Sequence, residues 1–222
     1  VTADVDRTVI TANEILAKFG DGPVQEIMRD HPRVSVSLEG AQREQSETFS
    51  SLLPMFILAL FIIYALLAIP LRSYGQPLII MSVIPFAFVG AVWGHIIMKA
   101  LGLLDSMAIM SIMGIVAASG VVVNSSLVLV HAVNHRRADG ISVNDAVIEA
   151  AVSRCRPILL TSLTTFAGLT PLLLNQSVQA GVLIPMATSV AWGVMLATVV
   201  TLLVVPAGYL ILDDAGARSS SV

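Results

Sequence analysis

The sequence predicts a mainly α-helical membrane protein, in which a bundle of five transmembrane helices follows a short N-terminal β-α-β unit. Of the 222 residues, 56% are hydrophobic and only 12% are charged, whereas soluble domains carry about 25% charged residues. The charges are also unevenly distributed, since residues 1–50 hold 14 of the 27 charged side chains and residues 51–212 hold only 10. A soluble N-terminal segment joined to a membrane domain explains both observations.

Five segments are apolar over the roughly 20 residues that a helix needs to cross the hydrocarbon core of a bilayer. Five such segments in succession, with almost no charge between them, argue against the buried helices of a soluble protein. The predicted spans lie at about 52–71, 77–98, 106–132, 157–174 and 180–212.

The basic residues of the loops predict the direction of the spans, because Lys and Arg are retained on the cytoplasmic side. Arg72 follows the first span, and the opposite loops hold only Lys99. The segment between the third and fourth spans carries four arginines: Arg136, Arg137, Arg154 and Arg156. We therefore expect residues 1–50 outside the cytoplasm and the tail, residues 213–222, inside it.

Residues 1–50 have the pattern of a β-α-β unit. After a short extended segment, apolar residues recur at mostly helical spacing between Thr8 and Met28, and residues 33–40 alternate as a half-buried strand does. Fifty residues bury too little core to be stable alone. We expect this unit to complete a larger extracytoplasmic domain.

A cytoplasmic amphipathic helix is expected between the third and fourth spans, at about 142–155. Ser142 and Asp145 fit the S-x-x-[DE] pattern of a helix N-cap. The apolar residues that follow share one face, and the polar residues lie mainly on the other. This pattern fits a helix in the membrane interface, and it fits equally a connector packed on the bundle.

Polar residues inside the spans are the candidates for function, because they are costly to keep in a membrane. The third span contains Asn124, Ser125 and Ser126 near its middle. One face of the same helix carries Ala117, Gly120, Asn124 and His131, and a stripe on the fourth span carries Thr161, Thr164, Thr165 and Gly168. Helix packing through small and hydroxyl residues explains these stripes as well as an ion or proton pathway does.

No other pattern predicts chemistry. The spans carry no Asp, Glu, Lys or Arg well inside them, so a proton carrier must come from elsewhere. His131 and His135 are spaced as two metal ligands would be, but no third ligand accompanies them, and Cys155 has no base beside it in the sequence. We expect no enzyme, no cofactor and no metal site, and the net charge of −3 provides no basic field for nucleic acid.

Three stretches of the sequence are distinctive in combination: LLAIPLRSYGQPLIIMSVIPFAFVGAVWGH, SGVVVNSSLVLVHAVNHRR and RCRPILLTSLTTFAGLTPLLL. They resemble the C-terminal half of resistance-nodulation-division (RND) transporters of the efflux-pump permease type. The upstream segment, from VTADVD to VSLEGAQREQSET, is similar to the last β-α-β of a periplasmic porter subdomain. The five spans would then correspond to the last five of the family's twelve.

The resemblance implies a proton–substrate antiporter in the inner membrane of a Gram-negative bacterium, exporting drugs or other amphiphiles. It implies a homotrimer that contacts the lipid bilayer, a periplasmic adaptor and an outer-membrane channel. The proton-carrying carboxylates of such transporters lie in the N-terminal half of the same transporter, which would be a further partner of this chain.

The resemblance also implies a set of proton-relay partners. The family's lysine on the helix that matches the third span falls on Asn124, and its relay threonine falls on Thr161. Arg154 matches a basic residue at the cytoplasmic end, and Ser125 replaces an Asp found in one branch of the family. Asn124, Ser125 and Thr161 are expected to order water or to hydrogen-bond to a distant carboxylate, and Thr165 completes the set of candidate relay partners.

A second interpretation is a non-transporting membrane scaffold or protein-export helper with the same architecture. In that case the neutral cluster around Asn124 only packs helices together. The absence of a charge at Asn124 and Ser125 favours this alternative.

Overall fold

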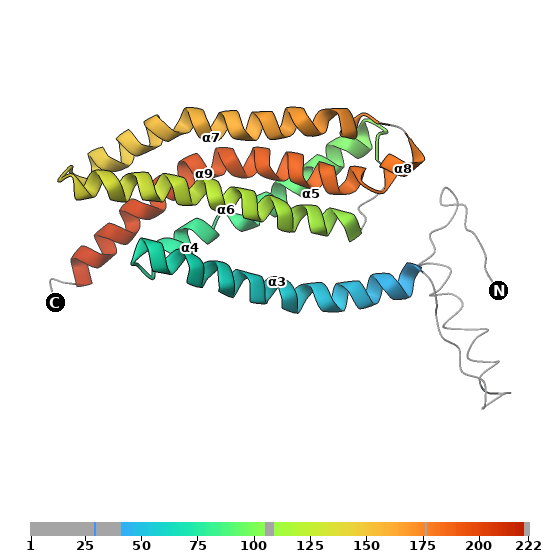
Figure 1. Cartoon of the computed structure of the whole chain (residues 1–222), viewed down its shortest axis with the longest axis horizontal. Coiled ribbons are helices and arrows are strands. Elements are labelled where there is room, and N and C mark those ends of the chain that lie inside the picture. Colours follow the sequence, from blue (N-terminus) through green and yellow to red (C-terminus); the bar gives the residue numbers. More distant parts are fainter. Residues whose placement is uncertain (1–28, 30–40, 105–108, 176, 220–222) are drawn as a thin grey trace. The chain divides into compact units, whose positions relative to one another are not determined.

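A computed structural model describes residue 29 and residues 41–104, 109–175 and 177–219 (Figure 1). All regular secondary structure in this part of the chain is helical. The chain divides into two compact units, Val1–Ser50 and Ser51–Val222. Of the β-α-β unit predicted for residues 1–50, residues 1–28 and 30–40 lie outside the described residues, whereas Arg29 and residues 41–50 are helical.

The second unit is a set of membrane-type helices. The described helices are α3 (Ala41–Leu71), α4 (Gln76–Met81), α5 (Ile84–Ala100), α6 (Ile109–Ala138), α7 (Val143–Leu173), α8 (Val178–Gly181) and α9 (Ile184–Ser219). Four segments within them are long and apolar enough to cross a membrane: Ser50–Leu71, Gln76–Ala100, Ile109–Ala138 and Ile184–Ala215. They coincide with the predicted first, second, third and fifth spans.

The predicted fourth span, at about 157–174, lies in the second half of α7, which is not one of these four segments. Threonine, serine and proline side chains dilute the apolar residues of this stretch. The predicted count of five spans is therefore not confirmed by length and hydropathy.

Helix α7 joins two segments that the sequence analysis treated as separate elements. The amphipathic stretch at 142–155 and the following span form one helix, which continues through Pro157. A proline inside a helix removes one backbone hydrogen bond without necessarily ending the helix. Ser142 caps the first turn by accepting a hydrogen bond from the backbone N–H of Asp145 at 3.3 Å, which confirms the predicted cap.

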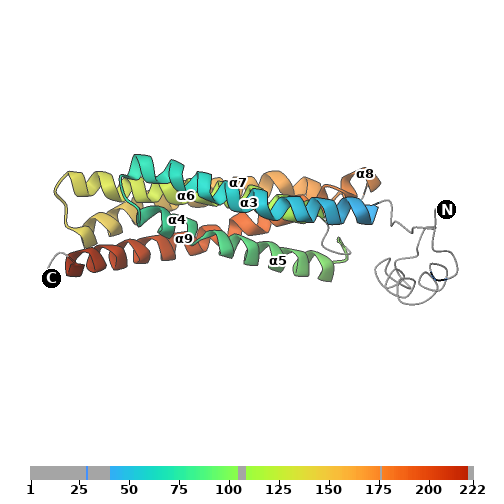
Figure 2. The ribbon, with the colours of Figure 1, turned by 90° about the horizontal axis from the view of Figure 1, so that it is seen from below.

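Helix α9 is the centre of the bundle and packs against α5, α6 and α7 (Figures 1 and 2). Small residues let these helices approach closely. A Cβ atom on Gly90 of α5 would lie 2.7 Å from the carbonyl oxygen of Trp192 on α9. One on Gly193 of α9 would lie 3.0 Å from the carbonyl oxygen of Ala87 on α5. The close contact between α5 and α9 therefore depends on glycine at positions 90 and 193, where a side chain would push the two helices apart.

Two prolines set the breaks that precede α5 and α9. Helix α4 is only 6 residues long. Helix α5 then starts at Ile84, with Pro85 in its first turn. The short helix α8 precedes α9 in the same manner, and α9 starts at Ile184 with Pro185 as its second residue. Proline has no N–H and is favoured in the first turn of a helix, so each Ile-Pro pair starts a new helix.

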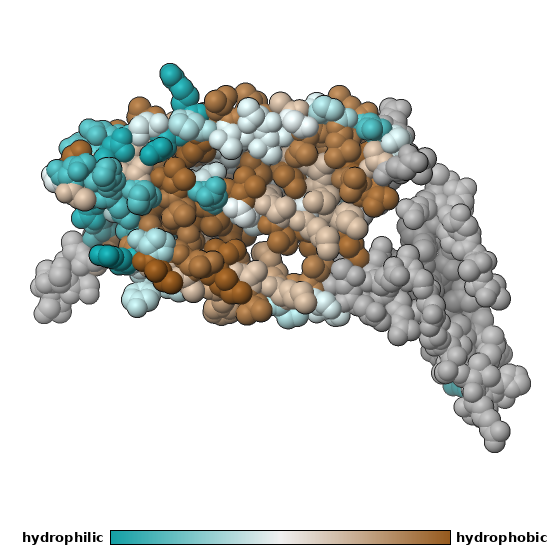
Figure 3. All heavy atoms as spheres, viewed as in Figure 1, coloured by the Kyte–Doolittle hydropathy of each residue, from teal (hydrophilic) through white to brown (hydrophobic). Residues whose placement is uncertain are grey.

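Helix α3 is largely separate from the rest of the bundle. Only 6% of its most apolar 18-residue window is buried, compared with 33–44% for the other three spanning segments. Figure 3 shows hydrophobic residues over the middle of the helices and hydrophilic residues gathered at the end where α6 turns into α7. Arg72, Arg136 and Arg137 lie at this end. This distribution suits a bundle surrounded by lipid.

The close contact of α6 with α9 generates a first prediction. A Cβ atom on Gly114 would clash with the carbonyl oxygen of Met186 and lie 2.7 Å from the Cβ of Ser189, whereas one on Gly120 meets nothing within 4 Å. Gly114→Ala should therefore lower the free energy of unfolding by about 1–3 kcal/mol. The matched control Gly120→Ala should leave it unchanged or raise it slightly, because alanine favours helix.

Thermal unfolding of the two variants in detergent, followed by circular dichroism, provides the measurement. Equal stability of Gly114→Ala and the unchanged protein would contradict the α6–α9 contact.

Candidate functional site

The outward face of α6 carries the predicted polar stripe of the third span. Ala117, Gly120, Asn124 and His131 are all exposed, whereas Ala118, Val122 and Ser126 on the opposite side are buried. The side chain of Asn124 makes no hydrogen bond within the described part of the chain. Its neighbour Ser125 is half-buried and donates to the carbonyl oxygen of Val121 at 3.2 Å.

The outward face of α7 carries the stripe predicted for the fourth span. Thr161, Thr164 and Gly168 are exposed, and Thr165 is half-buried. The Thr161 hydroxyl donates to the carbonyl oxygen of Pro157 at 2.8 Å, and the Thr165 hydroxyl donates to that of Thr161 at 2.8 Å. These hydrogen bonds stay within the helix, so the oxygen of each hydroxyl is still able to accept one from another group.

The two stripes lie at about the same level of the bundle. Helices α6 and α7 run antiparallel, and Arg136 of α6 donates to Glu149 at 3.3 Å and to Ser153 at 3.0 Å on α7. On α6, Asn124 lies twelve residues before Arg136. On α7, Thr161 lies twelve residues after Glu149, and Thr165 lies twelve residues after Ser153. Asn124, Thr161 and Thr165 thus lie at about the same level of the bundle, and Asn124 and Thr161 are exposed on the outer sides of their helices.

Arg154 lies on the same face of α7 as Thr161, seven residues away, which corresponds to a rise of about 10 Å. It is exposed, and it forms neither a hydrogen bond nor an ion pair with any described residue. Arg154 therefore does not contact Thr161, although it supplies a positive charge on the same side of the helix.

Other polar side chains of the spans are buried and paired inside the bundle. The Nδ1 atom of His95 lies 2.9 Å from the carbonyl oxygen of Ala91, and its Nε2 atom lies 2.9 Å from the hydroxyl of Ser111. The hydroxyls of Ser162 on α7 and Thr198 on α9 lie 2.5 Å apart. These groups hold helices together, and they do not point to a transport pathway.

A polar network at the arginine-rich end was not predicted. Gln76 and Asn134 exchange two amide hydrogen bonds, at 3.1 and 2.8 Å, and the Tyr209 hydroxyl donates to the Asn134 carbonyl oxygen at 2.7 Å. The Nη1 of Arg137 donates to the Tyr209 oxygen at 3.5 Å and to Asp213 at 2.8 Å. The network ties the start of α4 to the ends of α6 and α9. The sequence contains a signal for this network, because each of the three helices carries an amide or phenol side chain near this end: Gln76 on α4, Asn134 on α6 and Tyr209 on α9.

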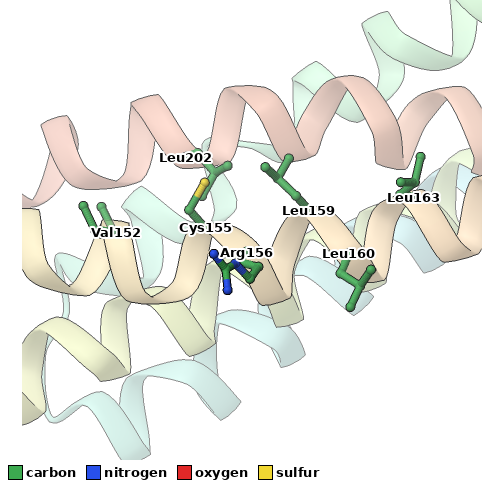
Figure 4. A pocket seen from close by; sticks show the side chains of 8 residues that line it. Val152, Cys155, Arg156, Leu159, Leu160, Leu163 and Leu202 are labelled. Carbon is green, nitrogen blue, oxygen red and sulfur yellow. The ribbon is translucent and has the colours of Figure 1, made fainter.

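An apolar groove runs between α7 and α9 (Figure 4). Leu159 and Leu163 of α7 and Leu202 of α9 line it, and Cys155 and Arg156 lie between Val152 and Leu159. Arg156 is the charged residue of this lining, and no carboxylate or histidine accompanies it. The groove therefore offers van der Waals contacts and no acid–base pair. No group of three His, Cys, Asp or Glu side chains able to hold a metal occurs among the described residues.

The polar network generates a second prediction, with a matched control on the same helix. Asn134→Ala leaves the amide of Gln76 and the hydroxyl of Tyr209 without their partner, and we expect it to lower the free energy of unfolding by about 1–2 kcal/mol. Asn124→Ala removes no hydrogen bond within this chain and should leave the unfolding of the purified chain unchanged. Urea or thermal unfolding in detergent measures both, and equal losses would show that the network is not stabilising.

Comparison with known proteins identifies the family to which these helices belong. Residues 23–213 match the sequence profile of the AcrB/AcrD/AcrF family. The swarming motility protein SwrC of Bacillus subtilis (strain 168) is 30% identical over 189 residues, which cover 82% of this chain and 17% of that protein. The chain thus spans about a fifth or less of this relative's length.

Solved structures show the same fold. A heavy metal efflux pump in crystal form II matches with a TM-score of 0.69 at 25% identity, covering 90% of this chain and 20% of the pump chain. Its crystal form I matches with a TM-score of 0.62 at 26% identity, covering 90% and 19%. Since the family profile covers most of the sequence, this chain belongs to the AcrB/AcrD/AcrF family of RND permeases.

Proposed function

We propose that this chain is the C-terminal membrane part of an RND-type secondary transporter that exports drugs or other amphiphiles by proton antiport. The outward stripe on α6 and α7 is the observation that carries this proposal. It is polar, it lies at the same level on both helices, and it has open space in front of Gly120 and Gly168, where an added Cβ would meet nothing within 4 Å.

A polar stripe on the outside of a membrane bundle requires a protein partner. Asparagine and threonine side chains facing lipid leave hydrogen-bonding groups without water, which is costly. Small residues in the same stripe allow another helix to approach closely. We infer that a helix from the N-terminal half of the transporter covers this stripe and brings the titrating carboxylate to it.

The stripe would respond to the protonation of that carboxylate through hydrogen bonds. The amide of Asn124 can donate to a carboxylate or accept from a carboxylic acid, and the hydroxyls of Thr161 and Thr165 can do both. A change of protonation then changes which group donates, and this favours a different packing of the covering helix on α6 and α7. Arg154, two turns away, supplies the positive charge that Asn124 lacks.

The remaining expectations from the resemblance are part of the same proposal. They are a homotrimer, a periplasmic adaptor and an outer-membrane channel as partners, five spans with the second half of α7 as the fourth, and a cytoplasmic position for the arginine-rich end. Residues 1–50 would then be periplasmic. The positive-inside distribution of arginines supports the orientation.

Metal ions are the competing substrate class, because the solved structures of similar fold are described as a heavy metal efflux pump. Export assays on cells that carry the complete transporter, with a panel of amphiphilic drugs and of metal salts, distinguish the two classes.

Thr161→Ala tests the coupling role of the stripe. It should lower the rate of proton-dependent export by about fivefold to tenfold, the effect of losing a hydrogen bond worth about 1 kcal/mol. Thr170→Ala is the matched control, because Thr170 also donates to its own helix, to the carbonyl oxygen of Phe166 at 2.9 Å, but lies away from the stripe. Transport unchanged by Thr161→Ala, or reduced equally by both variants, would remove Thr161 from the mechanism.

Asn124→Asp tests whether the stripe senses protonation. A protonated aspartic acid resembles asparagine in shape and charge, so transport at low pH should match that of the unchanged protein. As the pH rises the new carboxyl ionises and repels the carboxylate of the partner helix, so transport should fall. A pH profile of export that is identical for both proteins would contradict the proposal.

A non-transporting scaffold or protein-export helper is the alternative, and the neutral character of Asn124 and Ser125 favours it. The similar SwrC is described as a swarming motility protein. The two functions differ in the helix that covers the stripe: an acidic residue there is required for transport, and a neutral one is expected for a scaffold.

A further inference from the structure

A basic cavity of about 500 Å³ opens at the arginine-rich end of the bundle, between the α3–α4 turn and the ends of α6 and α9. Its basic side chains are Arg72, His131, His135 and Arg137, and no aspartate or glutamate lines it. Asn124 and Thr161 do not line the cavity; of the stripe on α6 it is His131 that does, seven residues from Asn124. The cavity is therefore suited to an anion and is separate from the proposed coupling site.

The inner wall of the cavity is held in place by hydrogen bonds. Gln76, Asn134 and Tyr209 line it and belong to the polar network. Arg137 uses one nitrogen, Nη1, for Tyr209 and Asp213. Its Nε and Nη2 atoms have no partner in the described part of the chain, so Arg137 retains donors for a second anion even though Asp213 is close.

The rim of the cavity is a tight turn that carries Arg72. The backbone of Arg72 has a φ of +48°, in the left-handed region that side chains other than glycine, asparagine and aspartate rarely adopt. Such a conformation persists only where the surrounding structure imposes it. The turn thus keeps a positive charge at the rim at a cost in backbone energy.

An apolar groove of about 340 Å³ runs between α3 and α4, and none of its lining is polar surface. Ile57, Leu60, Phe61 and Tyr64 of α3 line it. These positions share one face of α3 with Leu71, which lines the basic cavity. Tyr64 and Leu71 are two turns apart, about 10 Å along the helix, so the groove lies on the membrane side of the cavity, within reach of the acyl chain of a lipid whose headgroup is in the cavity.

We propose that the cavity and the groove together bind one anionic phospholipid, with its phosphate among Arg72, His131, His135 and Arg137 and an acyl chain between α3 and α4. Charge complementarity selects the anion, since arginine recognises phosphate through several N–H donors. The groove selects a lipid over a free phosphate, because only a lipid has an acyl chain that packs along its apolar wall. The lipid fills the space between α3 and a bundle that covers little of it.

The test uses the purified chain in detergent and native mass spectrometry to measure lipid affinity. Dioleoyl phosphatidylglycerol should bind more tightly than dioleoyl phosphatidylcholine, which has no net charge. Arg72→Asn tolerates the left-handed backbone and removes the charge, and it should lower the affinity for phosphatidylglycerol by about fivefold, the contribution of one cation at an anionic membrane surface. Arg72→Lys should retain most of the affinity.

Arg156→Asn is the matched control, because Arg156 is an exposed arginine of the membrane domain that lies outside this cavity. It should leave the affinity unchanged. Equal losses from Arg72→Asn and Arg156→Asn would overturn the proposal, since they would show a diffuse charge effect. Equal affinities of the unchanged chain for the two lipids would overturn it as well.

The groove is tested by the length of the lipid and by one filling variant. Ile57→Trp should weaken the binding of dioleoyl phosphatidylglycerol and leave that of dihexanoyl phosphatidylglycerol unchanged. Inorganic phosphate should fail to displace the long-chain lipid at equal concentration, and displacement would identify a small-anion site in place of a lipid site. These measurements involve no transport, so their failure is distinguishable from failure of the proposed antiport.

Discussion

The close packing of α9 against α5, α6 and α7 determines which helix faces of the membrane domain are buried. Glycine and alanine bring the backbones so near to each other that a Cβ on Gly90 or Gly114 would clash with α9. At such short separations a buried side chain must be small, and a buried hydroxyl must bond to its own helix or to the neighbouring one. Asn124, by contrast, lies on the outer face of α6, away from these contacts.

The polar residues of the spans therefore fall into two classes with different physical meaning. His95, Ser162 and Thr198 are buried and have partners inside the bundle, and this pairing accounts for their presence. Asn124 and Thr161 are exposed on neighbouring helices, with open space beside them. In a bilayer an exposed polar group needs a partner that this chain does not supply, and that need is the physical basis for assigning the stripe to an interface with the N-terminal half.

The proposed coupling site and the proposed lipid site lie at different levels of α6, with His131 at the charged end of the face that carries Asn124. The stripe lies at the middle of the helix, where hydrogen bonds are strong because water is excluded. The basic cavity lies at the charged end, where arginine side chains and anionic headgroups meet. Helix α3 buries little of its surface against the bundle. Its last residues line the cavity, so it is the element whose position a bound lipid would affect.

The sequence alone determined the elements that depend on local chemistry and periodicity. Apolar length predicted the first, second, third and fifth spans, the S-x-x-D pattern predicted the Ser142 cap, and helical spacing predicted that Ala117, Gly120, Asn124 and His131 share one face. The tertiary structure decided which face is buried, the continuity of α7 through Pro157 and the network joining Gln76, Asn134 and Tyr209. Periodicity states which residues lie together on a helix, but the partner of that face depends on contacts between segments distant in the chain, such as α4, α6 and α9.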